Sequence, residues 1–332
     1  IRDLIVTGVQ TCALPISNLS RYSTAVNDLN RLLQTAGRPF QTEISLADFR
    51  HETLSPVRSQ DLLHAAAEPE ISPFYHFFQQ RLPELMDGIS CVGISLCFLS
   101  QALCSFSLIG LIRQQYPQVK IVLGGGLVTT WLSRPDWHNP FGRLVDHLIS
   151  GEGELPLLKL LGAQSPYRQA APDYSQLPLE KYLSPGLILP YSAASGCWWN
   201  RCSFCPERAE GNRYHPRPIP QVLDQLQQQV HQYQPRLLHL LDNALAPALL
   251  QRLVELPPGV PWYGFVRFEQ QLADLQFCHA LKQSGCVMLK LGIESGDQRV
   301  LDRLHKGIEL GMAGRIQSDR KSTRLNSSHD QI

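Results

Sequence analysis

Three cysteines lie close together in the stretch "ASGCWWNRCSFCPERAEG", which runs from Ala194 to Gly211. Four residues separate Cys197 from Cys202, and two residues separate Cys202 from Cys205. Three thiolates on one loop can hold three irons of a cubane iron–sulfur cluster and leave the fourth iron open to a ligand from outside the protein. The spacing therefore indicates a metal centre with one open coordination position.

Two other interpretations of this cysteine loop stay open at this point. A closed structural zinc site needs four ligands, and His215, ten residues after Cys205, would complete a set of three cysteines and one histidine. A chance group of core thiols is less consistent with the polar neighbours Asn200, Arg201 and Glu207. A reducing compartment would favour a metal over a disulfide. Five further cysteines adjoin apolar runs and are expected to be buried: Cys91, Cys97, Cys104, Cys278 and Cys286.

The two ends of the chain do not resemble parts of a folded domain. One DNA string can encode "TGVQTCALPI", from Thr7 to Ile16, and its reverse complement encodes "DRKSTRLNSS", from Asp319 to Ser328. Both segments resemble translated sequencing adapter. We therefore expect residues 1–16 and 319–332 to be non-native, and the gene to be clipped at both ends.

The remaining chain has the size and charge of an ordinary enzyme. About 302 residues are enough for two domains with their own cores. The whole chain carries 30 Lys and Arg against 29 Asp and Glu, a formal charge of +1, which does not favour nucleic acid or an anionic membrane as a partner. No apolar run approaches the roughly 20 residues that span a bilayer. The expected location is the cytoplasm.

Alternating strand and helix patterns predict an α/β protein. For residues 17–162 we expect a Rossmann-like, doubly wound parallel sheet without its first strand. The apolar run "CVGISLCF" is typical of a parallel strand that is buried on both faces. The expected helices are 23–37, 74–86, 107–117 and 155–161, and the expected strands are 40–46, 91–98, 120–126 and 145–154.

Residues 163–187 have no sustained period and are the expected linker. For residues 188–318 we expect a partial, C-terminally truncated TIM-like β/α barrel, in which reactive residues lie at the carboxyl ends of the strands. Its expected strands are 187–191, 237–241, 262–268 and 287–293, and its expected helices are 218–233, 247–256, 270–284 and one near Val300.

The segment "GCWWNRCSFCPE" resembles the cluster loop of radical S-adenosylmethionine (radical SAM) enzymes, in a variant with one more residue between the first two cysteines. The resemblance implies that Cys197, Cys202 and Cys205 ligate a 4Fe-4S cluster whose fourth iron binds S-adenosylmethionine. It also implies reductive cleavage of S-adenosylmethionine to methionine and a 5'-deoxyadenosyl radical. Phe204 would then pack near the adenine.

Polar residues at three expected strand ends agree with that resemblance. Asn243 follows Asp242 after the second barrel strand, Arg267 ends the third, and Glu294 ends the fourth. By analogy, all three contact S-adenosylmethionine, with Arg267 at the methionyl carboxylate and Glu294 at the ribose or amino group. Surface charges with helix-capping duties are the structural alternative.

The first domain resembles the cobalamin-binding domain that precedes the radical domain in one branch of that family, in "VGISLCFLSQ", "VLGGG" and "SGEGELPL". A Rossmann-like sheet without a ligand uses similar glycines. His138, in "DWHNPFG", is expected to be an ordinary loop histidine and not a cobalt ligand. The resemblance implies cobalamin contacts at Ser95, Ser100, Gly124, Gly125, Gly126, Gly151, Glu152 and Gly153.

Together these resemblances predict a cobalamin-dependent radical SAM enzyme, most commonly a methyltransferase that acts on an unactivated carbon. They imply a small-molecule or peptide substrate, and an electron donor such as flavodoxin or ferredoxin. The alternatives are ring rearrangement or other carbon-skeleton chemistry, a non-catalytic zinc-binding module, and a clipped chain that is itself inactive.

Overall fold

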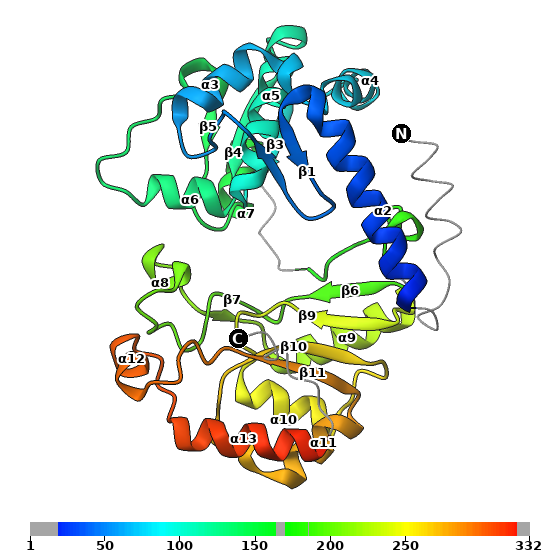
Figure 1. The fold of residues 1–332 in the computed structure, drawn as a ribbon, viewed down its shortest axis with the longest axis vertical. Helices are drawn as coiled ribbons and strands as arrows, with labels where there is room; N and C mark the ends of the chain where they lie inside the picture. Colours follow the sequence, from blue (N-terminus) through cyan, green and yellow to red (C-terminus); the bar gives the residue numbers. More distant parts are fainter. Residues whose placement is uncertain (1–18, 164–169, 185, 324–332) are drawn as a thin grey trace. The chain divides into compact units, whose positions relative to one another are not determined.

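A computed structural model describes residues 19–163, 170–184 and 186–323. These residues form two compact units, one on each side of residues 164–169 (Figure 1). The division falls inside the segment 163–187 that the sequence marks as a linker. The adapter-like segment 1–16 and residues 324–332 lie outside the described residues.

The first unit contains a three-stranded parallel sheet in the order β3-β4-β5, in which a helix follows each strand. Its strands are β3 (Cys91–Ser95), β4 (Lys120–Gly124) and β5 (His147–Leu148), and they alternate with α5 (Leu99–Gln115), α6 (Gly126–Leu132) and α7 (Glu154–Leu160). Helix α5 begins eight residues earlier than the sequence predicts and contributes more buried residues to the core of this unit than any single strand, among them Phe106 and Ile109. The predicted α/β class is therefore confirmed.

Strand β3 differs from the prediction. The central strand β4 buries Ile121, Val122 and Leu123 at 3% exposure or less, whereas Gly93 and Ser95 of β3 are exposed. Among the described residues β3 pairs with β4 alone, so it is an edge strand and not one buried on both faces. The prediction for Cys97 is also wrong, because this thiol is exposed just after β3.

Residues before the sheet form a helical layer and a hairpin. The predicted strand 40–46 is the short β1 (Thr42–Ile44), which pairs antiparallel with β2 (Phe49–His51) and stays outside the parallel sheet. A Cβ on Gly110 of α5 would lie 1.9 Å from the oxygen of Ala66 in α3, so glycine lets these two helices pack closely. The other elements are α2 (Leu19–Gly37), η2 (Arg38–Phe40), α3 (Ser59–Ala67), η3 (Pro69–Ile71) and α4 (Tyr75–Leu85).

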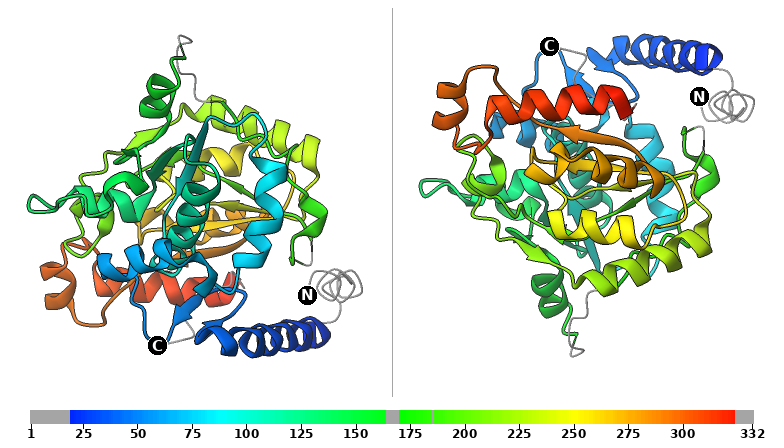
Figure 2. Two further views of the ribbon diagram at one scale, coloured as in Figure 1. Left: turned by 90° about the horizontal axis from the view of Figure 1, so that it is seen from above. Right: turned by 90° about the horizontal axis from the view of Figure 1, so that it is seen from below.

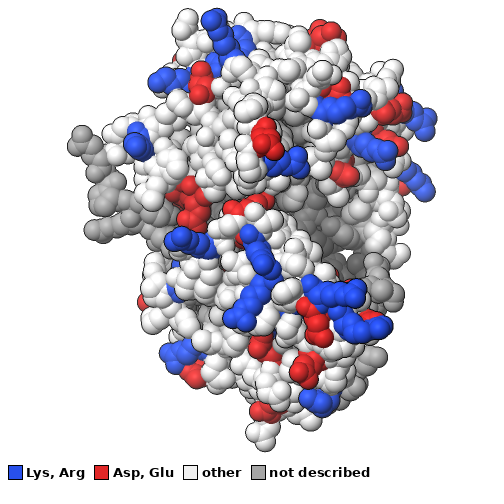
Figure 3. All heavy atoms as spheres, turned by 90° about the vertical axis from the view of Figure 1, so that its left-hand side faces the viewer, with Lys and Arg blue, Asp and Glu red and all other residues white. Residues whose placement is uncertain are grey.

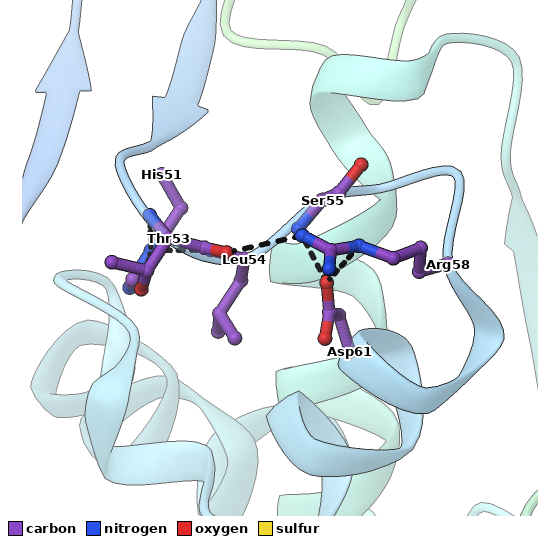
Figure 4. Close-up of polar contacts among 6 residues, drawn as sticks. All are labelled: His51, Thr53, Leu54, Ser55, Arg58 and Asp61. Carbon is purple, nitrogen blue, oxygen red and sulfur yellow. Dashed lines mark hydrogen bonds and ion pairs between the residues drawn. The ribbon is translucent and has the colours of Figure 1, made fainter.

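The turn between β2 and α3 is built on two side-chain acceptors (Figure 4). The Nδ1 atom of His51 accepts hydrogen bonds from the N–H groups of Thr53 and Leu54, at 3.2 and 3.1 Å. The Asp61 carboxylate accepts from the N–H of Ser55 at 2.8 Å and pairs with Arg58. Burial lowers the pKa of His51, which agrees with its role as a neutral acceptor.

Arg113, near the end of α5, ties this helix to the sheet. Its guanidinium donates to the main-chain oxygens of Leu144 and Val119 and to the Asp146 carboxylate. Asp146 also accepts from the N–H of Ile121 at 2.7 Å. Burial alone would raise the pKa of Asp146, but these hydrogen bonds and the arginine charge lower it. The short strand β5 is thereby fixed beside β4.

The second unit contains a four-stranded parallel sheet in the sequential order β6-β9-β10-β11, which is typical of part of a β/α barrel. Its strands are β6 (Ile188–Tyr191), β9 (Leu237–Leu240), β10 (Trp262–Val266) and β11 (Cys286–Leu291). The helices are α9 (Ile219–Tyr233), α10 (Pro247–Glu255), α11 (Leu275–Gln283), α12 (Gln298–Arg303) and α13 (Leu310–Thr323), with the 3-10 turns η5 (Leu179–Lys181) and η6 (Gln270–Ala273).

The predicted helix 270–284 is split into η6 and α11. Asp274 ends the first turn and caps the second helix, because its carboxylate accepts from the N–H of Gln276 at 2.8 Å. Helices cover one face of the sheet (Figure 2), where alternate strand residues such as Leu238, Leu240 and Trp262 are buried.

The surface carries charges of both signs. On the face in Figure 3, Lys and Arg side chains alternate with Asp and Glu side chains over both units. None of the helices within the described ranges combines the length and apolar character needed to cross a bilayer.

Candidate functional site

The cysteine loop is closed at its base by a two-stranded ribbon. Strand β7 (Ala194–Ser195) pairs antiparallel with β8 (His215–Pro216), so residues 196–214 form a loop whose ends meet. Gly196 has φ +70°, and a Cβ there would lie 2.3 Å from the oxygen of Arg213. Only glycine fits this entry to the loop. The short helix α8 (Pro206–Ala209) follows the third cysteine.

The three thiols differ in exposure. Cys202 is buried, whereas Cys197 and Cys205 are half-buried, and all three are free. Burial raises the pKa of the Cys205 thiol. No three His, Cys, Asp or Glu side chains of the described chain are gathered closely enough to hold a metal ion. His215 is an exposed residue of β8, and in the described chain neither the three cysteines alone nor the three cysteines with His215 are gathered into such a group.

Arg267 brings a buried positive charge to the cysteine loop. It follows β10, is 6% exposed, and its Nη1 lies 4.0 Å from the Cys202 sulfur. The guanidinium carbon lies 4.1 Å from the ring centroid of Trp199 and 5.7 Å from that of Trp198. Burial lowers the pKa of Arg267, and the thiols of Cys202 and Cys197 oppose that shift.

Two buried donors at this site make no hydrogen bond among the described residues, Trp198 Nε1 and Arg267 Nε, although Arg267 Nε forms an ion pair with Glu269 Oε1 at 3.7 Å. An unpaired buried donor costs about 1–3 kcal/mol. A group rich in acceptor atoms, such as the sulfides of an iron–sulfur cluster or a carboxylate, would satisfy both donors. Three free thiols on a closed loop, beside two such donors, fit the donor chemistry of a cluster site.

A segment more than 100 positions later supports the loop from the other side. The Trp199 indole donates to the oxygen of His305 at 3.0 Å, and the N–H of Ser203 donates to the oxygen of Leu304 at 2.9 Å. Gly307 has φ +65°, and a Cβ there would lie 2.1 Å from the Trp199 ring. Residues 303–307, which we name the supporting turn, therefore pack directly on the cysteine loop.

Lys306 of the supporting turn connects two predicted site residues. Its Nζ donates to Glu294 Oε1 at 3.1 Å and lies 5.3 Å from the ring centroid of Phe204, and its main-chain oxygen accepts from Arg267. Glu294 has φ +68°, a left-handed conformation that is uncommon for a residue with a side chain. The structure thus brings Phe204, Arg267 and Glu294 together through Lys306.

Asn243 and Asp242 contact the base of the same loop from the end of β9. The Asn243 amide donates to the oxygen of Gly196 at 3.4 Å. The buried Asp242 carboxylate accepts from the N–H of Ala193 at 3.0 Å. Burial raises the pKa of Asp242 although main-chain donors oppose the shift. Both side chains bond to main-chain atoms at the start of the cysteine loop, so their role in this structure is to position that loop.

In the first unit, the glycines and serines named from the sequence lie at one edge of the sheet. Ser95 ends β3 and is aligned with Gly124, which ends β4. Gly125 has φ +101°, and a Cβ there would lie 2.5 Å from the oxygen of Leu96, so the packing of the turn itself requires glycine. The remaining predicted cobalamin contacts follow the strands of this sheet: Ser100 is the second residue of α5, Gly126 begins α6, and Gly151, Glu152 and Gly153 connect β5 to α7.

Four residues of the site were not predicted from the sequence: Trp198, Trp199, Lys306 and Gly307. The two tryptophans stand inside the quoted motif, but their contact with Arg267 depends on how β10 is placed beside the loop. The supporting turn has no motif of its own. Its contacts follow from the return of the chain after α12.

Comparisons with known proteins agree with this architecture. No family model matches the chain. An uncharacterized methyltransferase of Pyrococcus horikoshii is 25% identical over 231 residues, which cover 57% of this chain and 48% of the relative. This chain thus spans about half the length of that relative.

Solved structures of the cobalamin-dependent S-adenosylmethionine radical enzyme OxsB are also similar. The form with aqua-cobalamin bound has a TM-score of 0.58 at 17% identity and covers 75% of this chain and 42% of OxsB. The form with aqua-cobalamin and S-adenosylmethionine bound has a TM-score of 0.57 at 18% identity, over the same shares of the two chains. The chain therefore has the α/β fold of the matched part of OxsB.

Proposed function

We propose that this chain is part of a cobalamin-dependent radical SAM enzyme. The observation that carries the proposal is the cysteine loop. Three free thiols share a loop closed by β7 and β8, and the loop lies beside a buried arginine and two donors that make no hydrogen bond among the described residues. Similarity in fold to OxsB, an enzyme described with cobalamin and S-adenosylmethionine, supports the same assignment.

In this proposal Cys197, Cys202 and Cys205 hold a 4Fe-4S cluster. When bound, the cluster supplies the electron that breaks a carbon–sulfur bond of S-adenosylmethionine. Arg267 places positive charge beside the Cys202 sulfur, and its guanidinium packs on the two indoles. Phe204, which is 49% exposed, and Glu294, which pairs with Lys306, are then the proposed contacts of S-adenosylmethionine.

The test is anaerobic reconstitution with iron and sulfide. We expect about four irons per chain, a brown absorbance, and 5'-deoxyadenosine and methionine when a reductant and S-adenosylmethionine are added. Cys202→Ala should lose the cluster-dependent cleavage, whereas Cys91→Ala, a change to a free thiol at the start of β3, should retain it. One zinc and no iron per chain would support the non-catalytic alternative and contradict the proposal.

For the first unit we propose cobalamin binding at the edge formed by Ser95, Gly124 and the turn 151–153. A Cβ on Gly124 would meet only Ile149, at 3.7 Å, so a larger side chain is tolerated by the fold. Gly124→Val should weaken binding of aquocobalamin, measured by the change in its visible spectrum, without lowering the melting temperature by more than a few degrees. Gly93→Val is the control, because Gly93 lies in the middle of β3 without a positive φ, and no atom lies within 4 Å of a Cβ there.

Methyl transfer to an unactivated carbon is the finer proposal, and the similarity to the methyltransferase of Pyrococcus horikoshii supports it. Transfer of a labelled methyl group from S-adenosylmethionine to a product tests it. Deoxyadenosine formation without any methylated product would favour rearrangement chemistry instead.

A further inference from the structure

The guanidinium group of Arg267 is enclosed by protein atoms, and the side chain is only 6% exposed. Its Nη2 donates to the main-chain oxygen of Lys306, and its Nη1 lies 4.0 Å from the Cys202 sulfur. Its Nε lies 3.7 Å from Glu269 Oε1. Each guanidinium nitrogen thus already faces a protein atom. Arg267 is therefore better placed to act on the cysteine loop than to contact a cosubstrate.

The surroundings of Arg267 let its charge act strongly on the Cys202 sulfur. Both side chains are buried, and the Trp199 ring packs on the guanidinium, with 4.1 Å between the ring centroid and the guanidinium carbon. Charges interact more strongly where water is excluded, because the local dielectric constant is lower. The reduction potential of an iron–sulfur cluster depends on nearby charge and on hydrogen bonds to its sulfurs. A buried arginine beside a cluster ligand would therefore stabilise the reduced, more negative cluster.

Two other cations near the cysteine loop should have a smaller effect on a cluster. The Nζ of Lys306 is paired with Glu294 Oε1 at 3.1 Å, so its charge is compensated. Arg201 of the loop is exposed, and water and salt screen its charge. The charge of Arg267 is compensated only in part, because Glu269 approaches its Nε at 3.7 Å without a hydrogen bond.

We infer that Arg267 raises the reduction potential of the cluster held by the cysteine loop, and that Glu269 moderates this effect. One electron from a low-potential reductant adds one negative charge to the cluster and breaks no bond, and the nearby positive charge stabilises that reduced state. Arg267 acts through the Cys202 ligand and touches no substrate, so its role differs from the carboxylate contact that the family resemblance implies. The inference rests on the proposed function, because it needs the cluster.

The experiment is a potentiometric titration of the reconstituted full chain with dithionite, in which the EPR signal of the reduced cluster is measured without S-adenosylmethionine. Arg267→Met should lower the midpoint potential, because the reduced cluster loses a favourable charge. We expect the ratio of reduced to oxidised cluster at a given potential to fall about tenfold, which corresponds to about 59 mV for one electron. Arg267→Lys keeps the positive charge and should stay close to the parent value.

Glu269→Gln should shift the potential in the opposite direction, which a general loosening of the loop would not do. Its removal leaves the Arg267 charge uncompensated, and the ratio of reduced to oxidised cluster should rise about threefold, since water already screens a carboxylate that is 32% exposed. The matched control is Glu255→Gln, which also removes a carboxylate paired with an arginine. Glu255 lies before β10, whereas Glu269 follows it, so the control should leave the potential unchanged.

Equal potentials in the parent, Arg267→Met and Glu269→Gln would overturn the inference. An unchanged potential in Arg267→Met together with weaker binding of S-adenosylmethionine would also overturn it, because that result places Arg267 at the cosubstrate. If Arg267→Met does not fold, the difference between Glu269→Gln and Glu255→Gln decides the question. Iron bound without any difference in potential contradicts this inference alone, whereas a parent chain that binds no iron contradicts the proposed function as well.

Discussion

The indole N–H of Trp199 donates a hydrogen bond to the main-chain oxygen of His305 at 3.0 Å, across 106 positions of the sequence. The same indole ring lies over the Arg267 guanidinium, and Arg267 in turn donates to the oxygen of Lys306. Trp199 of the cysteine loop, Arg267 at the end of β10 and the supporting turn are thus in direct contact with one another. Substitutions in the supporting turn should therefore change the conformation of the cysteine loop and its capacity to bind iron.

Gly307→Ala tests that contact. The substitution combines an unfavourable positive φ with a Cβ 2.1 Å from the Trp199 ring. We expect a loss of about 2–4 kcal/mol in the free energy of unfolding and a lower iron content after reconstitution. Gly259→Ala is the matched control, because Gly259 also has positive φ but no atom within 4 Å, and it should cost only about 1 kcal/mol. Equal losses from denaturant unfolding of the two variants would contradict the packing argument.

Substitution of Glu294 should lower the free energy of unfolding more than substitution of its partner Lys306. The Lys306 side chain is 11% exposed and that of Glu294 is 41% exposed. Glu294→Gln leaves a buried ammonium without its counter-ion and should destabilise the chain by about 1–3 kcal/mol. Lys306→Met leaves a carboxylate that water can reach and should cost less than about 1 kcal/mol. Chemical denaturation of both variants checks the order, and the reverse order would refute it.

Arg113→Met should destabilise the first unit strongly. The change removes the donors to Leu144, Val119 and Asp146 that fix α5 to β4 and β5. We expect a loss of about 2–4 kcal/mol, with faster hydrogen exchange at the amides of β4. Arg252→Met removes an exposed ion pair within one helix and should change stability by less than about 0.5 kcal/mol. Similar losses in the two variants would mean that Arg113 does not hold the sheet.

Protonation of His51 should loosen the turn in Figure 4. The folded pKa of His51 lies below the unfolded value of about 6.5, so the unfolded chain binds the proton more readily. The stabilising contribution is therefore complete above about pH 6.5 and is lost as the pH falls through the lower, folded pKa. His51→Asn keeps an acceptor that does not titrate.

Denaturant unfolding of the parent and of His51→Asn across this pH range should show a steeper loss of stability in the parent. Parallel curves for the two proteins would contradict the role of His51 as a neutral acceptor.

Much of the fold is predictable because both sheets are made of local strand–helix units. The predicted strand 187–191 agrees with β6 to within one residue, and the predicted helix 218–233 agrees with α9 to within one residue. The exceptions depend on neighbours. The exposed edge of β3 depends on which strands pair beside it, and the hairpin β1–β2 depends on a partner five residues away. Helix α3 was missed, since nine residues give little periodic signal.

For this protein the sequence by itself determined the alternation of strands and helices, the three-cysteine spacing, and the glycines at the carboxyl edge of the first sheet. Those features depend on residue type and on neighbours a few positions away. Only the tertiary structure decided that Trp199 meets the supporting turn and that Lys306 joins Glu294 to Phe204. Contacts across many positions depend on strand register and helix packing, which no local pattern encodes.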